Sequence, residues 1–148
     1  MKAVVQRVRE ASVTVDGQTV AAIDHGLLVL LGVAPGDGEH EIAWMARKLP
    51  ALRIFPDEAG QMNRALVDTG GAILLVSQFT LFGDCRKGNR PGFSGAGEPG
   101  IAEACYLDLT ARLRAQLGAT RVATGRFGAH MHVRLLNDGP VTLILDTP

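Results

Sequence analysis

The sequence is poor in cysteine, in aromatic residues and in excess charge of either sign, and each shortage excludes a class of protein. Its 148 residues include two cysteines, Cys85 and Cys105, which do not make a disulfide framework or a zinc site. Aromatic residues are 5% of the chain, too few for the stacking platforms of a module that binds single-stranded nucleic acid. Lys and Arg number 15, as do Asp and Glu, which argues against a nucleic-acid-wrapping surface but leaves a small basic patch open.

Long apolar runs and nucleotide-binding motifs are also missing. No stretch of about 18 apolar residues occurs, and the opening M-K-A-V-V-Q-R-V-R-E interleaves charges where a signal peptide would have an apolar core. Neither kind of glycine-rich phosphate loop is present. These absences predict a soluble, cytoplasmic protein without a membrane partner, and we expect no cofactor and no metal.

The rest of the composition is that of an ordinary globular domain. Hydrophobic residues make up 47% and charged residues 20%, and there is no internal repeat or low-complexity tail. A chain of this length buries a sufficient core without disulfides or metals. We therefore expect a single domain over residues 1–148.

Hydrophobic periodicity switches between strand and helix spacing along the chain. Alternation on both sides of Asp16-Gly17 predicts a β-hairpin with a two-residue turn. Asp138-Gly139 predicts a second hairpin near the C-terminus, although Pro140 has no N–H to give to the following strand. The other predicted elements are strands at 27–33, 73–81, 129–135 and 141–145, and helices at 38–50 and 101–117.

This order of elements predicts the fold class. Hairpins at both ends with helices between them favour an α+β fold over a doubly wound parallel sheet. We expect a mixed, mainly antiparallel sheet that curls toward a barrel and carries two main helices.

Three polar side chains mark the end of the apolar strand predicted at 73–81. If the strand continues through S-Q-F-T-L-F, Gln78 and Thr80 share one face, and Phe79 and Leu81 share the other. Strand ends beside long loops often carry function. Thr80 is a possible nucleophile only if a base activates it, and no base is identifiable, so an ordinary strand end remains the alternative.

The stretch 83–100 is rich in glycine and carries three cations, Arg86, Lys87 and Arg90. Flexible backbone with cations suits a phosphate or the end of a nucleic acid, although a solvated surface loop explains it equally well. His130 and His132 share one face of a predicted strand. No third ligand appears at a revealing spacing, so we interpret them as a polar solvent-facing pair rather than a metal site.

Two of these segments resemble the signature motifs of one protein family. S-Q-F-T-L (77–81) and N-D-G-P-V-T (137–142) are similar to those of the D-aminoacyl-tRNA deacylases of the bacterial and eukaryotic type. The resemblance extends nearly from end to end, through M-K-A-V-V-Q-R-V, D-H-G-L-L-V-L-L-G-V, R-K-G-N-R-P-G-F and T-G-R-F-G-A-H-M. Its weakest part is Cys105 to Leu109, which has the spacing of helix core.

The resemblance implies a hydrolase that cleaves the ester joining a D-amino acid, or glycine, to the terminal ribose of tRNA. It implies a homodimer in which a cis Gly139-Pro140 peptide of one subunit enters the active site of the other. The floor of that site is then Ser77, Gln78, Phe79 and Thr80. The family mechanism relies on main-chain groups and on the 2′-hydroxyl of the substrate rather than on a side-chain nucleophile.

Physical reasoning sharpens these expectations. An aminoacyl ester is already activated, so donors for the developing oxyanion and a positioned water suffice, and we expect the N–H groups around Phe79 and Thr80 to be those donors. Rejecting an L substrate requires a rigid obstacle, which a closely approaching Gly-Pro backbone would provide. We expect Arg86, Lys87 and Arg90 to contact tRNA, with Arg7 a weaker candidate. The rival hypotheses are a non-catalytic nucleic-acid-binding module and a structural oligomeric domain.

Overall fold

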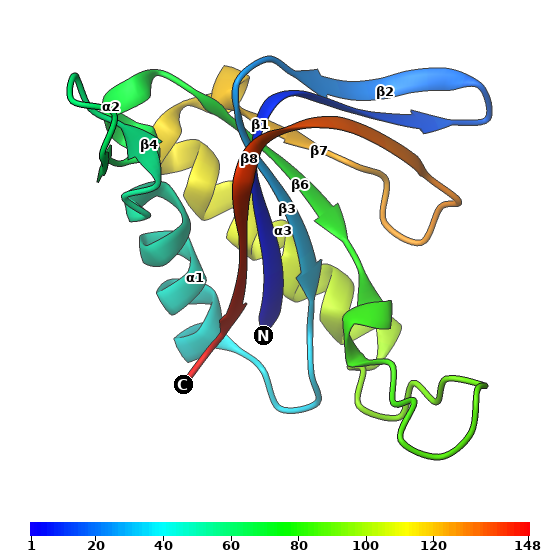
Figure 1. The fold of residues 1–148 in the computed structure, drawn as a ribbon. Helices are drawn as coiled ribbons and strands as arrows, with labels where there is room; N and C mark the ends of the chain where they lie inside the picture. Colours follow the sequence, from blue (N-terminus) through cyan, green and yellow to red (C-terminus); the bar gives the residue numbers. More distant parts are fainter.

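A computed structural model describes all residues from Met1 to Pro148 (Figure 1). Two long helices and one large sheet dominate it, with several short elements between them. In chain order the elements are β1 (Lys2–Val15), β2 (Gln18–Ile23), β3 (Gly26–Gly32), α1 (Glu39–Ala51), β4 (Phe55–Pro56), β5 (Met62–Arg64), α2 (Leu66–Thr69), β6 (Ala72–Ser77), a 3-10 turn (Phe79–Phe82), α3 (Pro99–Leu117), a 3-10 turn (Ala119–Arg121), β7 (Val122–Thr124) and β8 (His132–Asp146).

The main sheet has six strands and is nearly closed into a barrel-like shape. Its strand order is β2-β1-β3-β6-β7, and β8 pairs with β1. Strands β3, β6 and β7 run parallel to one another, and the pairs that β1 makes with β2, β3 and β8 are antiparallel. The expectation of an α+β fold with a mixed, mainly antiparallel sheet and two main helices is therefore confirmed.

Each face of the sheet has its own apolar core. Helices α1 and α3 pack on one face, where Met45, Leu49, Leu109 and Leu113 are fully buried against the strands (Figure 1). The curved ends of the strands enclose a smaller core on the other face, around Leu74. The long strand β1 contributes to both cores, which ties the two layers together.

The N-terminal hairpin forms as predicted. Asp16 and Gly17 both have positive φ values, 50° and 77°, as a two-residue type I′ turn requires. Val15 lies opposite Gln18 across the turn. Local turn chemistry is therefore sufficient to fix this register.

The predicted C-terminal hairpin is wrong, because β8 runs without reversal from His132 to Asp146. Asn137 pairs with Val8 and Thr142 with Gln6, so Asp138–Val141 form a bulge opposite the single residue Arg7. The Gly139-Pro140 peptide bond within this bulge is cis. A bulge needs no ladder hydrogen bond from its extra residues, so it accommodates a proline that lacks an N–H.

The strand predicted at 73–81 is also shorter than expected. Strand β6 ends at Ser77, and Phe79–Phe82 form a 3-10 turn, so Gln78 and Thr80 do not share the face of a strand. Ser77 is the last residue of β6 that pairs with β3, and helical hydrogen bonds replace the ladder after it: the N–H of Leu81 donates to the carbonyl of Gln78 at 3.3 Å, and that of Gly83 to the carbonyl of Thr80 at 2.9 Å.

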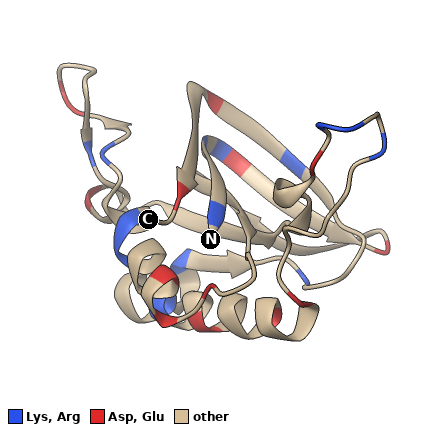
Figure 2. Cartoon of the chain, turned by 90° about the horizontal axis from the view of Figure 1, so that it is seen from below, with Lys and Arg blue, Asp and Glu red and all other residues tan.

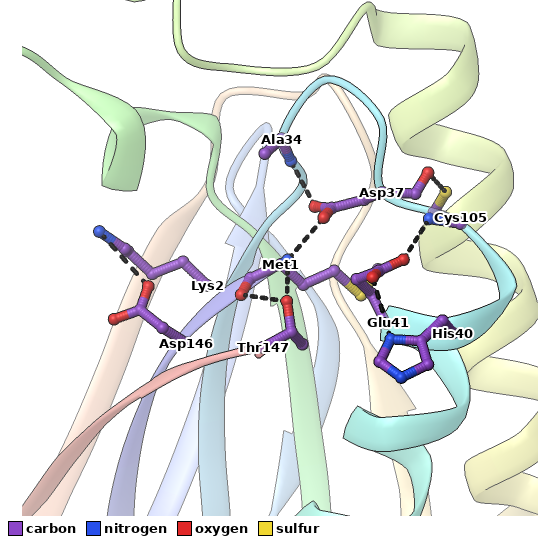
Figure 3. Close-up of polar contacts among 10 residues, drawn as sticks. Met1, Lys2, Ala34, Asp37, His40, Glu41, Cys105, Asp146 and Thr147 are labelled. Carbon is purple, nitrogen blue, oxygen red and sulfur yellow. Dashed lines mark hydrogen bonds and ion pairs between the residues drawn. The ribbon is translucent and has the colours of Figure 1, made fainter.

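The ends of β1 and β8 lie together beside the loop that leads to α1. The amino group of Met1 donates to Asp37 Oδ1 at 2.8 Å and to Thr147 Oγ1 at 2.6 Å (Figure 3). Asp37 Oδ2 accepts from the N–H of Ala34 at 2.6 Å, which fixes the loop itself. None of the helices has the length and apolar character that crossing a membrane requires.

Candidate active site

A cavity of about 550 Å³ lies at the carboxyl ends of the parallel strands. Ligands of sheets that contain parallel strands commonly bind at this edge, where successive strands end beside connecting loops. Ser77, Gln78 and Phe79 line the cavity where β6 ends, opposite residues from the loop before α3 and from the segment before β8. Those opposite residues include Phe93, Pro99, Phe127, His130 and Met131.

Main-chain hydrogen bonds position the segment after β6. The N–H of Gln78 donates to the carbonyl of Leu31 at 2.7 Å, which attaches the turn to β3. The N–H groups of Phe79 and Thr80 donate to no carbonyl, because the first donors of a helical turn have no partner within it. This segment therefore presents free N–H donors beside the cavity.

Thr80 is exposed and is not part of the cavity wall, so it does not share the position of the other three predicted residues. Its Oγ1 accepts a hydrogen bond from Gln78 Nε2. The side chains of Gln78 and Thr80 are thus coupled, and no base contacts the Thr80 hydroxyl.

Aromatic rings form one rim of the cavity. Phe79 and Phe93 meet edge to face with ring centroids 5.2 Å apart, although their exposed fractions are 57% and 39%. Exposed aromatic rings beside a cavity are suited to covering a ligand. Sequence reasoning did not place Phe93 in the site, although it ends the segment R-K-G-N-R-P-G-F, which carries part of the resemblance.

The two histidines at the start of β8, His130 just before it and His132 its first residue, differ from expectation in one respect. Both are exposed, with ring centroids 4.9 Å apart, but His130 lines the cavity instead of facing only solvent. No group of three His, Cys, Asp or Glu residues is arranged to hold a metal ion. His130 therefore belongs with Phe127 and Met131 on the wall that periodicity in the sequence did not reveal.

Tyr106 of α3 packs against a residue of the cavity wall. Its hydroxyl donates to the carbonyl of Leu75 at 2.8 Å, and its ring packs against Phe127 with centroids 6.0 Å apart. Burial raises the pKa of Tyr106 to about 12. This hydroxyl consequently stays protonated and holds β6 to α3, away from any proton transfer.

The bulge with Gly139 and Pro140 lies elsewhere on the chain. Ser77 is opposite Leu31, and Leu31 is opposite Ala3 of β1. Strand geometry then puts the bulge roughly 13 Å along β1 and roughly 14 Å across three strand spacings from Ser77. A single chain therefore does not bring Gly139-Pro140 to Ser77–Thr80.

The loop that follows the 3-10 turn Phe79–Phe82 has its cations at its outer end, and none of them lines the cavity (Figure 2). Arg86 is paired with Asp84, with Nη2 2.7 Å from Oδ2, and this contact holds the pKa of the Asp84 carboxyl below its usual range. Lys87 and Arg90 are exposed and have no partner. Arg7 is less accessible to tRNA than Lys87 and Arg90, because its side chain is only 12% exposed and forms an ion pair with Asp138.

The cysteines give no sign of catalytic use. Burial raises the pKa of the Cys105 thiol, which lies 3.9 Å from the carbonyl of Asp37. Cys85 is exposed in the basic loop and does not line the candidate site cavity.

Comparisons with known proteins agree over the whole chain. The family model described as D-Tyr-tRNA(Tyr) deacylase matches residues 4–146. A D-aminoacyl-tRNA deacylase of Magnetococcus marinus is 59% identical over 148 residues, covering 100% of this chain and 97% of the relative. A D-aminoacyl-tRNA deacylase of Halalkalibacterium halodurans is 55% identical over 147 residues, covering 99% of both chains.

Two solved structures are similar in fold. One, described as a c-Myc DNA unwinding element binding protein, has a TM-score of 0.95 and 44% identity over 100% of this chain and 99% of its own. The other, described as a probable eukaryotic D-amino acid tRNA deacylase, has a TM-score of 0.81 over 99% of this chain and 98% of its own. At 18% identity the second likeness concerns the fold alone.

Proposed function

Because the chain belongs to the family of D-aminoacyl-tRNA deacylases, which hydrolyse the ester bond joining an amino acid to tRNA, we propose that it performs this hydrolysis in the cavity beyond β6. One observation carries the assignment of the site. Three residues of the S-Q-F-T-L motif, Ser77, Gln78 and Phe79, line that cavity, and two main-chain donors of the same motif are unpaired.

The chemistry follows from these donors. Water attacks the ester carbonyl, and the N–H groups of Phe79 and Thr80 stabilise the oxyanion that develops. Gln78 orients the turn through its bond to Thr80 Oγ1. The 2′-hydroxyl of the terminal ribose assists the leaving oxygen, so no side-chain nucleophile is required.

Selection against L substrates comes from a second subunit. Gly139 and Pro140 are exposed on a bulge, far from the cavity of their own chain, so they suit a role in the cavity of a partner. The outer edge of β8 pairs with no strand, and Leu136 and Ile144 on this strand are 56% and 69% exposed. An exposed, unpaired edge supports association with a second copy of the chain.

The same gate has a consequence for glycine. An L side chain would collide with the Gly-Pro backbone, whereas glycine has no side chain to collide, so glycyl-tRNA is a further substrate. Lys87 and Arg90, with Arg86, contact the RNA near its 3′ end. The enzyme works in the cytoplasm, where charged tRNA is used.

A binding module for DNA is the second candidate, because one structure of similar fold is described by its DNA element. Balanced charge and few aromatic residues disfavour this function. Incubation with D-aminoacyl-, L-aminoacyl- and glycyl-tRNA, followed by measurement of ester loss, separates the two. Loss of the D and glycyl esters is expected, and intact D esters would refute the assignment.

The cross-subunit gate has its own test. Gly139→Ala crowds the gate and Gln78→Ala damages the floor, so each homodimer should hydrolyse D substrates weakly. After mixing under conditions that exchange subunits, each heterodimer contains one site built from an intact floor and an intact gate. Each heterodimer should therefore have about half the activity of a parental dimer, which has two intact sites. No recovery would place gate and floor on the same chain.

A further inference from the structure

A second, polar pocket of about 330 Å³ lies beside the bulge, on a part of the chain to which no role has been given. It separates β1 and the bulge of β8 from the segment Phe55–Thr69. Five polar or charged residues line it, and we call it the Arg9–Arg64 pocket; they are Arg9, His25, Arg64, Thr69 and Asp138.

The pocket has an excess of positive charge. Asp138 is its single acidic residue, and each carboxylate oxygen is already engaged, Oδ2 by Arg7 at 2.9 Å and Oδ1 by Arg9 at 3.1 Å. Two guanidinium groups therefore face one carboxylate, and Arg64 adds a third cation. The pocket therefore has no free carboxylate for a cationic ligand, whereas the guanidinium groups of Arg9 and Arg64 can bind an anionic one.

Donors in the pocket are left unused. Arg9 contacts Asp138 through Nε alone, and its side chain is 70% exposed. Arg64 donates one hydrogen bond, from Nη2 to the carbonyl of Asp68, and His25 Nε2 lies 3.3 Å from the carbonyl of Thr69. The remaining guanidinium N–H groups form the flat, forked donors that bind phosphate oxygens well.

We propose that the Arg9–Arg64 pocket binds a backbone phosphate of the RNA substrate. This inference rests on the proposed function, since a tRNA deacylase must hold a feature that all tRNAs share. Asp138 joins the pocket directly to Gly139-Pro140, so a phosphate held here would place the RNA strand beside the gate. The pocket would thus position the 3′ end for the partner's floor.

Salt-dependent binding of uncharged tRNA tests the pocket directly. Arg64→Ala should lower the slope of log K against log salt by about one, and Arg64→Lys should retain it, because one phosphate contact contributes about that much. Arg47→Ala is the matched control, since Arg47 is exposed on α1 and lines neither the active-site cavity nor the Arg9–Arg64 pocket. An unchanged slope in Arg64→Ala, or an equal fall in Arg47→Ala, overturns the proposal.

Kinetics with two substrates provide a second readout. D-aminoacyl-adenosine carries the ester without a phosphate, so the ratio of kcat/KM for D-aminoacyl-tRNA to that for D-aminoacyl-adenosine should fall about tenfold in Arg64→Ala. If the parental chain hydrolyses neither substrate, the proposed function fails, while the salt slope still reports on the pocket. If a poly-glutamate peptide binds the parental chain but not Arg64→Ala, while both bind tRNA equally, the pocket belongs to an acidic protein segment and the RNA assignment is refuted.

Discussion

Arg7 holds Asp138 at two points, with its Nε 3.1 Å from the main-chain carbonyl and 2.9 Å from carboxylate Oδ2. Arg7 is also the residue of β1 that lies opposite the bulge, and its Nη1 donates to the carbonyl of Ile54. The Arg7 side chain thus holds the bulge where the ladder is interrupted, and it links the bulge to the segment before β4.

Replacing Arg7 should loosen the bulge. Arg7→Ala leaves the carbonyls of Asp138 and Ile54 and the carboxylate oxygen Oδ2 of Asp138 without their donor, and we expect the free energy of unfolding to fall by about 2 kcal/mol. Deacylation should fall with it. Arg9→Ala is the control, because it removes an exposed partner of the same carboxylate and should cost less than about 1 kcal/mol. Urea unfolding measures both, and equal costs would contradict a special role for Arg7.

Gly139→Ala should abolish most activity toward D substrates. A Cβ at this position would lie 2.7 Å from Asn137 Oδ1, and Asn137 itself donates to the carbonyls of Arg7 and Val141. The substitution therefore disturbs the bulge as well as the space in front of it. Combining it with Asn137→Ala relieves the clash within the chain, so an inactive double variant indicates crowding of the substrate, whereas recovered activity indicates distortion of the bulge.

Thr80→Ala tests whether the hydroxyl is a nucleophile. The main-chain N–H of residue 80 survives the substitution, so the loss in kcat should be at most about a hundredfold, no more than the removal of one oxyanion donor. Thr80→Ser keeps the acceptor for Gln78 and should lose less. Mass spectrometry of the quenched reaction provides the decisive measurement, because an acyl group on Thr80 would replace direct hydrolysis with covalent catalysis.

The sequence predicts the elements whose pattern is local. Periodicity and turn chemistry are sufficient for the hairpin at Asp16-Gly17 and for helix α3, which ends at the residue before Gly118. Strand β8 is different, because its continuity depends on pairing with β1 at the other end of the chain. The same Asp-Gly signal therefore produces a turn at Asp16-Gly17 and a bulge at Asp138-Gly139.

The candidate site shows the same limit. Ser77 and Gln78 were identified because polar residues end an apolar strand, a signal visible in the sequence. His130 and Met131 follow β7, and they reach the cavity because β6 and β7 run parallel and end on the same side. Strand order decides this proximity, and no spacing along the chain encodes it.

The basic loop should give tRNA binding part of its salt dependence. Lys87→Ala and Arg90→Ala should each reduce the slope of log K against log salt by roughly 0.7 to 0.9, as one lost phosphate contact does. Arg86→Ala should have a smaller effect, because Asp84 already neutralises that guanidinium. Binding of uncharged tRNA between low and moderate salt measures the slopes, and a flat dependence in the parental protein would remove this loop from the tRNA interface.

Tyr106 is the single tyrosine of the chain, so its ionisation can be followed directly by absorbance near 295 nm. Burial raises its pKa to about 12 in the folded protein, while an unfolded tyrosine titrates near about 10. The unfolded state then loses its proton first, so the stability that Tyr106 contributes is complete below about pH 10 and is lost as the pH rises toward about 12.

Tyr106→Phe should remove this pH dependence. At neutral pH the substitution should lower the free energy of unfolding by about 1 kcal/mol, because the hydrogen bond to the carbonyl of Leu75 is lost. That carbonyl still accepts a hydrogen bond from the N–H of Gly125 at 2.9 Å. Urea unfolding of both proteins from pH 8 to 11 should show the parental advantage shrinking at the alkaline end. A native tyrosine that titrates near about 10 would contradict the burial of this hydroxyl beneath the cavity.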